Sequence, residues 1–71
     1  MIVIEHAKSL HNYDVKLIQC ETEYCVVYGA EINRFPRTGS IRALEDAIQE
    51  YNACVLHQMG TDGFFDDDIL K

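Results

Sequence analysis

Residues 13–31, YDVKLIQCETEYCVVYGAE, decide the fold because they alternate apolar and polar side chains in two successive segments. In residues 13–20 and again in residues 23–31, every second side chain points to the same side, which is the period of a half-buried β-strand. The short polar connection between the segments predicts an antiparallel hairpin. The register expected from a tight connection at Thr22-Glu23 pairs Cys20 with Cys25, Ile18 with Val27, and Leu17 with Tyr28.

The rest of the chain adds one expected strand and one expected helix. Residues 2–7 are a short, β-branched apolar run that predicts a strand. Pro36 and Gly39 interrupt the strand pattern, and Ser40 or Thr38 is expected to cap the helix that follows. The helix is predicted from apolar side chains that recur at spacings of three and four: Ile41, Leu44, Ile48, Tyr51 and Val55.

The predicted helix has two sides and is expected to end at Gly60. Ala47 and Cys54 flank its apolar stripe. Its polar side carries Arg42, Glu45, Asp46, Gln49, Glu50 and Asn52. We expect the stripe to pack on the hairpin face with the larger apolar side chains, which are Tyr13, Val15, Leu17, Val26 and Tyr28.

These elements predict an α+β fold in a single domain, residues 1–71. The expected architecture is a small antiparallel sheet of two to three strands with one long amphipathic helix packed on one face. The order is β-β-β-α, followed by a short C-terminal tail.

Charge is distributed unevenly along the chain, whose formal net charge is −6. Residues 1–44 hold five acids and five bases, whereas residues 45–71 hold seven acids and only Lys71 as a base. An acidic field of this kind repels nucleic acid and anionic membranes and attracts basic protein surfaces. The sequence therefore predicts no direct nucleic-acid binding, no membrane association, and a basic protein surface as the partner.

The predicted function is a non-enzymatic, acidic, protein-binding inhibitor or regulator. It would occupy a basic, nucleic-acid-binding surface of its partner by presenting carboxylates as a phosphate backbone does. The expected partner-binding residues are Glu45, Asp46, Glu50, Asp62, Phe64, Phe65, Asp66, Asp67 and Asp68. The alternative is that these charges only keep the helix and the tail soluble.

In size, acidity and expected architecture, the chain is similar to many phage-encoded inhibitors of host nucleic-acid machinery, including anti-CRISPR proteins. The similarity lies in this general profile, and no individual motif carries it. It implies a viral protein that acts on a partner in the cytoplasm.

Three other interpretations are open. A homodimer is expected if strands pair at an edge, or if the second sheet face associates through Ile18, Cys20, Cys25 and Val27. A zinc module would combine Cys20, Cys25, Cys54 and His57. An anion site would use the basic residues near the helix start, Arg34, Arg37 and Arg42.

Catalysis, cofactors and export are not expected. The histidines have no nucleophile motif near them, and a chain of 71 residues leaves little room for a deep pocket. No resident metal or cofactor is predicted. The apolar start of the chain stops at Glu5, too early for a secretory signal or a membrane span, and the odd number of cysteines indicates reduced thiols. A cytoplasmic location is therefore expected.

Overall fold

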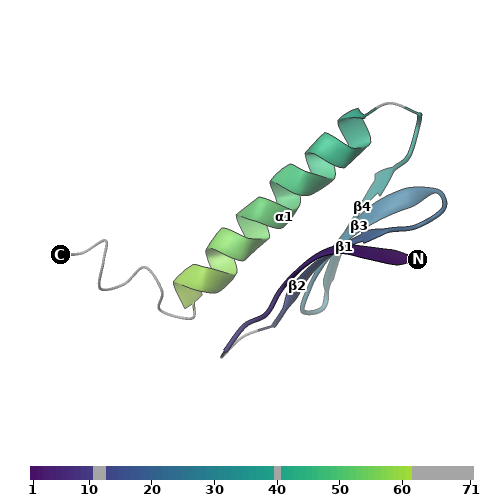
Figure 1. Ribbon diagram of the computed structural model, residues 1–71. Helices are drawn as coiled ribbons and strands as arrows, with labels where there is room; N and C mark the ends of the chain where they lie inside the picture. Colours follow the sequence, from purple (N-terminus) through teal and green to yellow (C-terminus); the bar gives the residue numbers. More distant parts are fainter. Residues whose placement is uncertain (11–12, 40, 62–71) are drawn as a thin grey trace.

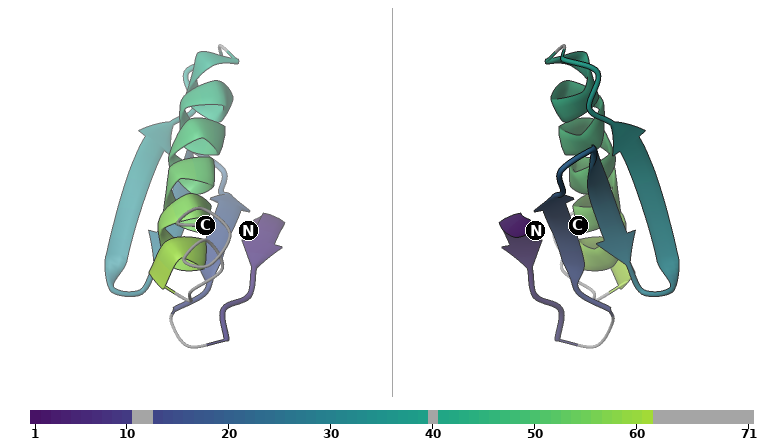
Figure 2. Two further views of the ribbon diagram at one scale, coloured as in Figure 1. Left: turned by 90° about the vertical axis from the view of Figure 1, so that its left-hand side faces the viewer. Right: turned by 90° about the vertical axis from the view of Figure 1, so that its right-hand side faces the viewer.

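The computed structural model describes residues 1–10, 13–39 and 41–61, and these form one antiparallel sheet covered on one face by a helix (Figure 1). The elements are β1 (Ile2–Ala7), β2 (Val15–Gln19), β3 (Glu23–Tyr28), β4 (Glu31–Pro36) and α1 (Arg42–Thr61). Each strand pairs with the next one along the chain, so the sheet is a meander with β1 and β4 at its edges (Figure 2). Within the described ranges, no helix has both the length and the apolar character needed to cross a membrane.

The α+β class and the single helix on one face are confirmed, but the predicted strand number is wrong. The sheet has four strands, and the order is β-β-β-β-α instead of β-β-β-α. The predicted C-terminal tail lies outside the described residues.

The missed strand is β4, which follows β3 after a two-residue turn at Gly29-Ala30. Gly29 has a φ of 63° and no other residue of this turn has a positive φ, the backbone pattern of a type II′ hairpin turn. The sequence prediction instead continued β3 through this turn to Glu31. Because β4 is rich in polar side chains, its alternation is weak and does not signal a buried strand.

The β2–β3 hairpin has the predicted faces but a different register. The Cys20 amide donates a hydrogen bond to the Glu23 carbonyl (2.8 Å), so the turn residues are Glu21-Thr22 rather than Thr22-Glu23. Ile18 consequently pairs with Cys25 and not with Val27. The slip is two residues, and an even slip leaves every side chain on its predicted face.

The core lies between the helix and the strand residues that face it. Leu17, Val15 and Val26 are at most 1% exposed, and they pack against Ala47 and Cys54 of α1. A small side chain at Ala47 lets the helix approach the sheet closely. Aromatic side chains fill the flanks of this contact: Tyr24, Tyr28, Phe35 and Tyr51.

The buried side of the helix is rotated relative to the predicted stripe. Ile48 is 40% exposed and Ile41 is 74% exposed, although both were expected in the core. Ala47 and Cys54, expected only to flank the stripe, lie at its centre, and Gln58 continues the same line. The prediction weighted side-chain size, whereas close packing on the sheet favours small residues.

Gln58 fixes the C-terminal half of α1 to the sheet. Its side-chain amide is buried and donates hydrogen bonds to the carbonyls of Ala7 (3.0 Å) and Tyr13 (3.2 Å). The helix includes Gly60, which was expected to end it, and extends to Thr61. At the other end, the Ile41 carbonyl accepts the first helical hydrogen bond from the Glu45 amide (3.0 Å). The predicted cap Ser40 lies outside the described residues.

Candidate functional site

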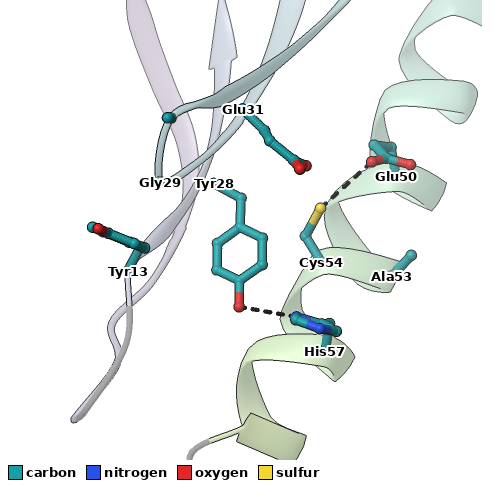
Figure 3. A pocket seen from close by; sticks show the side chains of 9 residues that line it. Tyr13, Tyr28, Gly29, Glu31, Glu50, Ala53, Cys54 and His57 are labelled. Atoms are coloured by element: carbon teal, nitrogen blue, oxygen red, sulfur yellow. Dashed lines mark hydrogen bonds between the residues drawn. The ribbon is translucent and has the colours of Figure 1, made fainter.

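A groove of about 570 Å³ lies between the β3–β4 turn and the middle of α1 (Figure 3). Its volume falls within the range of about 300–1,000 Å³ that is typical of ligand pockets. The lining residues are Tyr13, Tyr28, Gly29, Ala30, Glu31, Glu50, Ala53, Cys54 and His57. The helix and the sheet therefore both contribute to it.

Tyr28 crosses the groove from the sheet to the helix. It extends from the end of β3, and its hydroxyl group forms a 3.1 Å hydrogen bond with Nδ1 of His57 (Figure 3). The two rings also meet edge to face, with their centroids 5.7 Å apart. This double contact fixes the tyrosine ring as a wall of the groove.

Glu50 projects from the helix toward the sheet. Its Oε2 atom accepts a hydrogen bond from Nδ2 of Asn33 on β4 (2.9 Å) and another from Sγ of Cys54 (3.5 Å). The carboxylate is half-buried, which corrects its predicted position on the solvent side of the helix. Its partners are an amide and a thiol, so the groove residue Glu50 has no cationic partner among the described residues.

A second carboxylate, that of Glu31, faces the same groove. Glu31 pairs with Tyr28 across the turn and therefore has the same sheet face, and its side chain extends toward Glu50 on the helix (Figure 3). None of the nine lining residues is a lysine or an arginine. The groove thus combines an aromatic wall, the buried thiol of Cys54, the exposed methyl group of Ala53 at its rim and two acidic groups.

The thiol of Cys54 is affected by both carboxylates. Burial raises the pKa of Cys54 to about 11, with further contributions from its hydrogen bond to Glu50 and from the negative charges of Glu50 and Glu31. The thiol therefore stays protonated at neutral pH, when it is a weak nucleophile and a weak metal ligand.

Gly29 allows Tyr13 to pack at the end of the groove. A Cβ atom at position 29 would lie 2.8 Å from Cδ2 of the Tyr13 ring, which is closer than real contacts allow. The positive φ of Gly29 also disfavours a side chain there. The missing side chain at position 29 therefore allows the β3–β4 turn and the segment before β2 to approach closely.

The structure separates the predicted partner-binding residues. Glu45 and Asp46 are exposed on α1, whereas Glu50 lies in the groove. The other predicted residues lie outside the described residues: Asp62, Phe64, Phe65, Asp66, Asp67 and Asp68.

Arg34 and Arg37, two arginines of the predicted anion site, contact the β2–β3 end of the sheet. Arg34 forms an ion pair with Glu23, and Arg37 donates a hydrogen bond to the Cys20 carbonyl (2.7 Å). The guanidinium group of Arg37 also lies 5.3 Å from the centre of the Tyr24 ring. The charge of Arg34 is thus neutralised by Glu23, and the guanidinium donors of Arg37 are directed to the carbonyls of the β2–β3 turn.

The four-ligand zinc site is contradicted by the position of its cysteines. Cys25 pairs with Ile18 on the sheet face away from the helix, whereas Cys54 lies on the helix and packs against the opposite face. The sheet separates the two sulfurs. In the part of the chain that the structure describes, no three His, Cys, Asp or Glu side chains are grouped so that they could hold a metal ion.

Sequence reasoning missed Tyr28 and Glu31 as site residues, and it considered His57 only as a zinc ligand. The Gly29-Ala30 turn was the available signal, because a hairpin at that point places Glu31 beside Tyr28 on the helix-facing side. The approach of His57 depends on the rotation of the helix, which the sequence pattern did not specify. Comparisons with known protein families, with curated proteins and with solved structures find no match.

Proposed function

We propose that this chain is an acidic protein-binding inhibitor or regulator that occupies a basic, nucleic-acid-binding surface of a partner. One observation supports this most directly. Glu45 and Asp46 are exposed on α1, and the ion pairs formed between described residues, Arg34 with Glu23 and His6 with Asp14, leave both of them out.

Two of the three arginines are used away from this helix surface, and the third, Arg42, lies in the first turn of α1, before Glu45 and Asp46. Arg34 and Arg37 lie at the β2–β3 end of the sheet, where they contact Glu23 and the turn carbonyls. A surface of exposed carboxylates then attracts lysines and arginines of another protein, and such pairing sets association rate and specificity more than affinity. Asp62 and residues 66–68 add four acidic groups on sequence grounds, and Phe64 and Phe65 would supply apolar contact.

A binding role is also favoured over thiol catalysis. Burial raises the pKa of Cys25 and of Cys54 to about 11, so both thiols are protonated at neutral pH. Among the described residues, His57 is hydrogen-bonded to the hydroxyl group of Tyr28, and no serine, threonine or cysteine nucleophile is paired with it. The role proposed here is that of the phage-encoded inhibitors whose profile the chain resembles, and it implies a cytoplasmic partner.

The test is affinity capture from the source organism with the full chain as bait, followed by elution with increasing salt. We expect the main retained protein to be a basic nucleic-acid-binding protein. It should be released between low and moderate salt and displaced by its own nucleic acid, because both compete for the same cationic surface.

The matched variants remove equal charge from two places. The double variant Glu45→Gln, Asp46→Asn should weaken capture several-fold, whereas Glu5→Gln, Glu21→Gln should leave it nearly unchanged. A complex that resists salt, or that both pairs of substitutions weaken equally, would contradict the proposal.

A second candidate function, a homodimeric structural or adaptor protein, is favoured by the exposed side of the sheet. Val3 is 53% exposed and Ile32 is 51% exposed, and no described element covers this face. Light scattering at increasing protein concentration separates the two functions. A stable dimer that Ile32→Lys dissociates would favour this second function.

A further inference from the structure

We propose that the groove between the β3–β4 turn and α1 receives an arginine side chain of the basic partner. The guanidinium group would lie between the carboxylates of Glu31 and Glu50, with its aliphatic stem along Tyr28 and Ala53. This inference rests on the proposed function, and it names the one residue type that the groove recognises.

The charge of the groove selects a cation. Glu31 and Glu50 line it without a lysine or an arginine, and the thiol of Cys54 is protonated. An anionic ligand would meet repulsion from both carboxylates, whereas a cationic side chain would be attracted by both.

The hydrogen-bonding capacity of the two carboxylates favours a guanidinium group over other cations. The bonds that Glu50 accepts, from Asn33 and Cys54, are both to Oε2, which leaves Oε1 for an external donor. The side-chain carboxylate of Glu31, whose backbone pairs with Tyr28, forms no hydrogen bond or ion pair with another described residue. A planar guanidinium has five N–H donors and can bond to two carboxylates at once, which an ammonium group on a flexible stem does less well.

The apolar lining suits the stem of the same side chain. Long basic side chains bury their methylene groups along apolar surfaces while the charged end meets polar groups. Tyr28 and Ala53 supply this surface, and the hydrogen bond between Tyr28 and His57 holds the tyrosine ring in place. A guanidinium group also stacks on aromatic rings, so the Tyr28 ring is a second source of affinity.

The experiment is an NMR titration of the full ¹⁵N-labelled chain with N-acetyl-arginine amide. The uncharged isostere N-acetyl-citrulline amide is the matched control ligand. We expect the amide signals of Gly29, Ala30, Ala53 and His57 to shift with the arginine ligand, with millimolar affinity, and to respond at least 5-fold more weakly to the citrulline ligand. Equal responses to both ligands would overturn the proposal.

Two variants test the contribution of the groove carboxylate. Glu31→Gln should weaken binding of the arginine ligand about 5-fold, because it removes one of the two negative charges of the groove. The side chain of Glu31 is exposed, so the substitution should leave the fold unchanged. Glu21→Gln removes the same charge at the β2–β3 turn and should have no effect. Equal weakening by both variants would mean that the ligand responds to net charge alone, and the groove would not be the site.

A longer probe separates failure of this inference from failure of the proposed function. If a hexa-arginine peptide binds with steep salt dependence, is weakened by Glu45→Gln, Asp46→Asn and is unaffected by Glu31→Gln, the groove inference is overturned while the acidic helix surface stands. If the peptide does not bind even at 20 mM salt, both are overturned. Weakening by Glu31→Gln beyond that caused by Glu21→Gln supports the groove.

Discussion

Two thiol–carboxylate pairs lie on opposite faces of the same sheet. On the face away from the helix, Sγ of Cys25 donates to Glu23 (3.2 Å), and on the helix side Sγ of Cys54 donates to Glu50 (3.5 Å). Both thiols have their pKa raised to about 11, chiefly by burial. The two pairs differ in what else contacts the carboxylate.

At Glu23 the further partner is a cation, and at Glu50 it is a neutral amide. Arg34 neutralises Glu23, and the pKa of Glu23 is lowered by its hydrogen bond from Cys25 and by Arg34. Asn33, the neighbour of Arg34 on β4, donates to Glu50 but brings no charge. Adjacent residues of one strand thus leave Glu23 paired with a cation and Glu50 without one, which is why an external cation is expected at Glu50 in the groove and not at Glu23.

The largest expected effect is the difference in unfolding free energy between an alanine substitution on the helix-covered face of the sheet and one on the opposite face. Leu17 is 1% exposed on the helix-covered face, so Leu17→Ala should lower the free energy of unfolding by about 2–5 kcal/mol. Ile18 lies on the other face and is half-exposed, so Ile18→Ala should cost only about 1 kcal/mol. Urea unfolding followed by circular dichroism measures both, and equal costs would mean that the second face is covered in solution.

Alkylation rates test the similarity of the two thiols. At pH 8, a thiol with a pKa of about 11 has roughly 100-fold less thiolate than an ordinary cysteine, so Cys25 and Cys54 should react about 100-fold more slowly with iodoacetamide than in the unfolded chain. Peptide mapping by mass spectrometry distinguishes the sites. Glu50→Gln should accelerate Cys54 and leave Cys25 unchanged; acceleration of both would indicate general loosening of the fold.

The role of Asn33 is tested by placing an arginine at position 33, on the helix-covered face of β4, and by removing the arginine at position 34, on the opposite face. Asn33→Arg places a cation beside Glu50 and should weaken binding of N-acetyl-arginine amide about 10-fold, because the groove then contains its own counter-ion. The matched variant Arg34→Asn leaves the groove intact and should retain full binding. Retained binding in Asn33→Arg, with a folded spectrum, would refute the charge argument.

The smallest expected effect is the loss of stability in acid that follows from protonation of Glu23, which is paired with Arg34. The pKa of Glu23 lies below its ordinary value of 4.5 in the folded chain, so the stability it contributes is present above pH 4.5 and is lost as the pH falls through the lowered pKa. The difference in melting temperature between the natural chain and Glu23→Gln should therefore be constant from pH 7 to pH 5 and shrink by pH 3. A difference in melting temperature that grows toward pH 3 would contradict a lowered pKa of Glu23 in the folded chain.

The fold was predictable to the extent that alternation and helical spacing determine it. The side-chain faces of β2 and β3 were predicted correctly despite a wrong register, because the error at Thr22-Glu23 was two residues and preserved parity. Strand β4 was missed because Asn33 and Arg34 give it little apolar alternation, and its pairing depends on the Gly29-Ala30 turn.

The groove was less predictable than the fold. Glu50 is separated from Glu31 by 19 positions and was placed on the solvent side, because hydrophobic size assigned the buried stripe to Ile48. Glu50 faces the sheet because the helix packs with Ala47, one turn earlier, against the core residues of the sheet. That approach is a property of packing between elements, and residue spacing alone does not determine it.

The irregularity of β1 has a consequence for how the protein behaves at high concentration. Val3 lies opposite Ile18 and Glu5 opposite Leu17, so Ile4 has no counterpart on β2. An apolar edge such as Ile2–Ala7 invites further chains to add by main-chain pairing, which leads to open-ended fibres. The extra residue interrupts the regular spacing of amide and carbonyl groups on that edge, and thereby opposes fibre growth without a covering element.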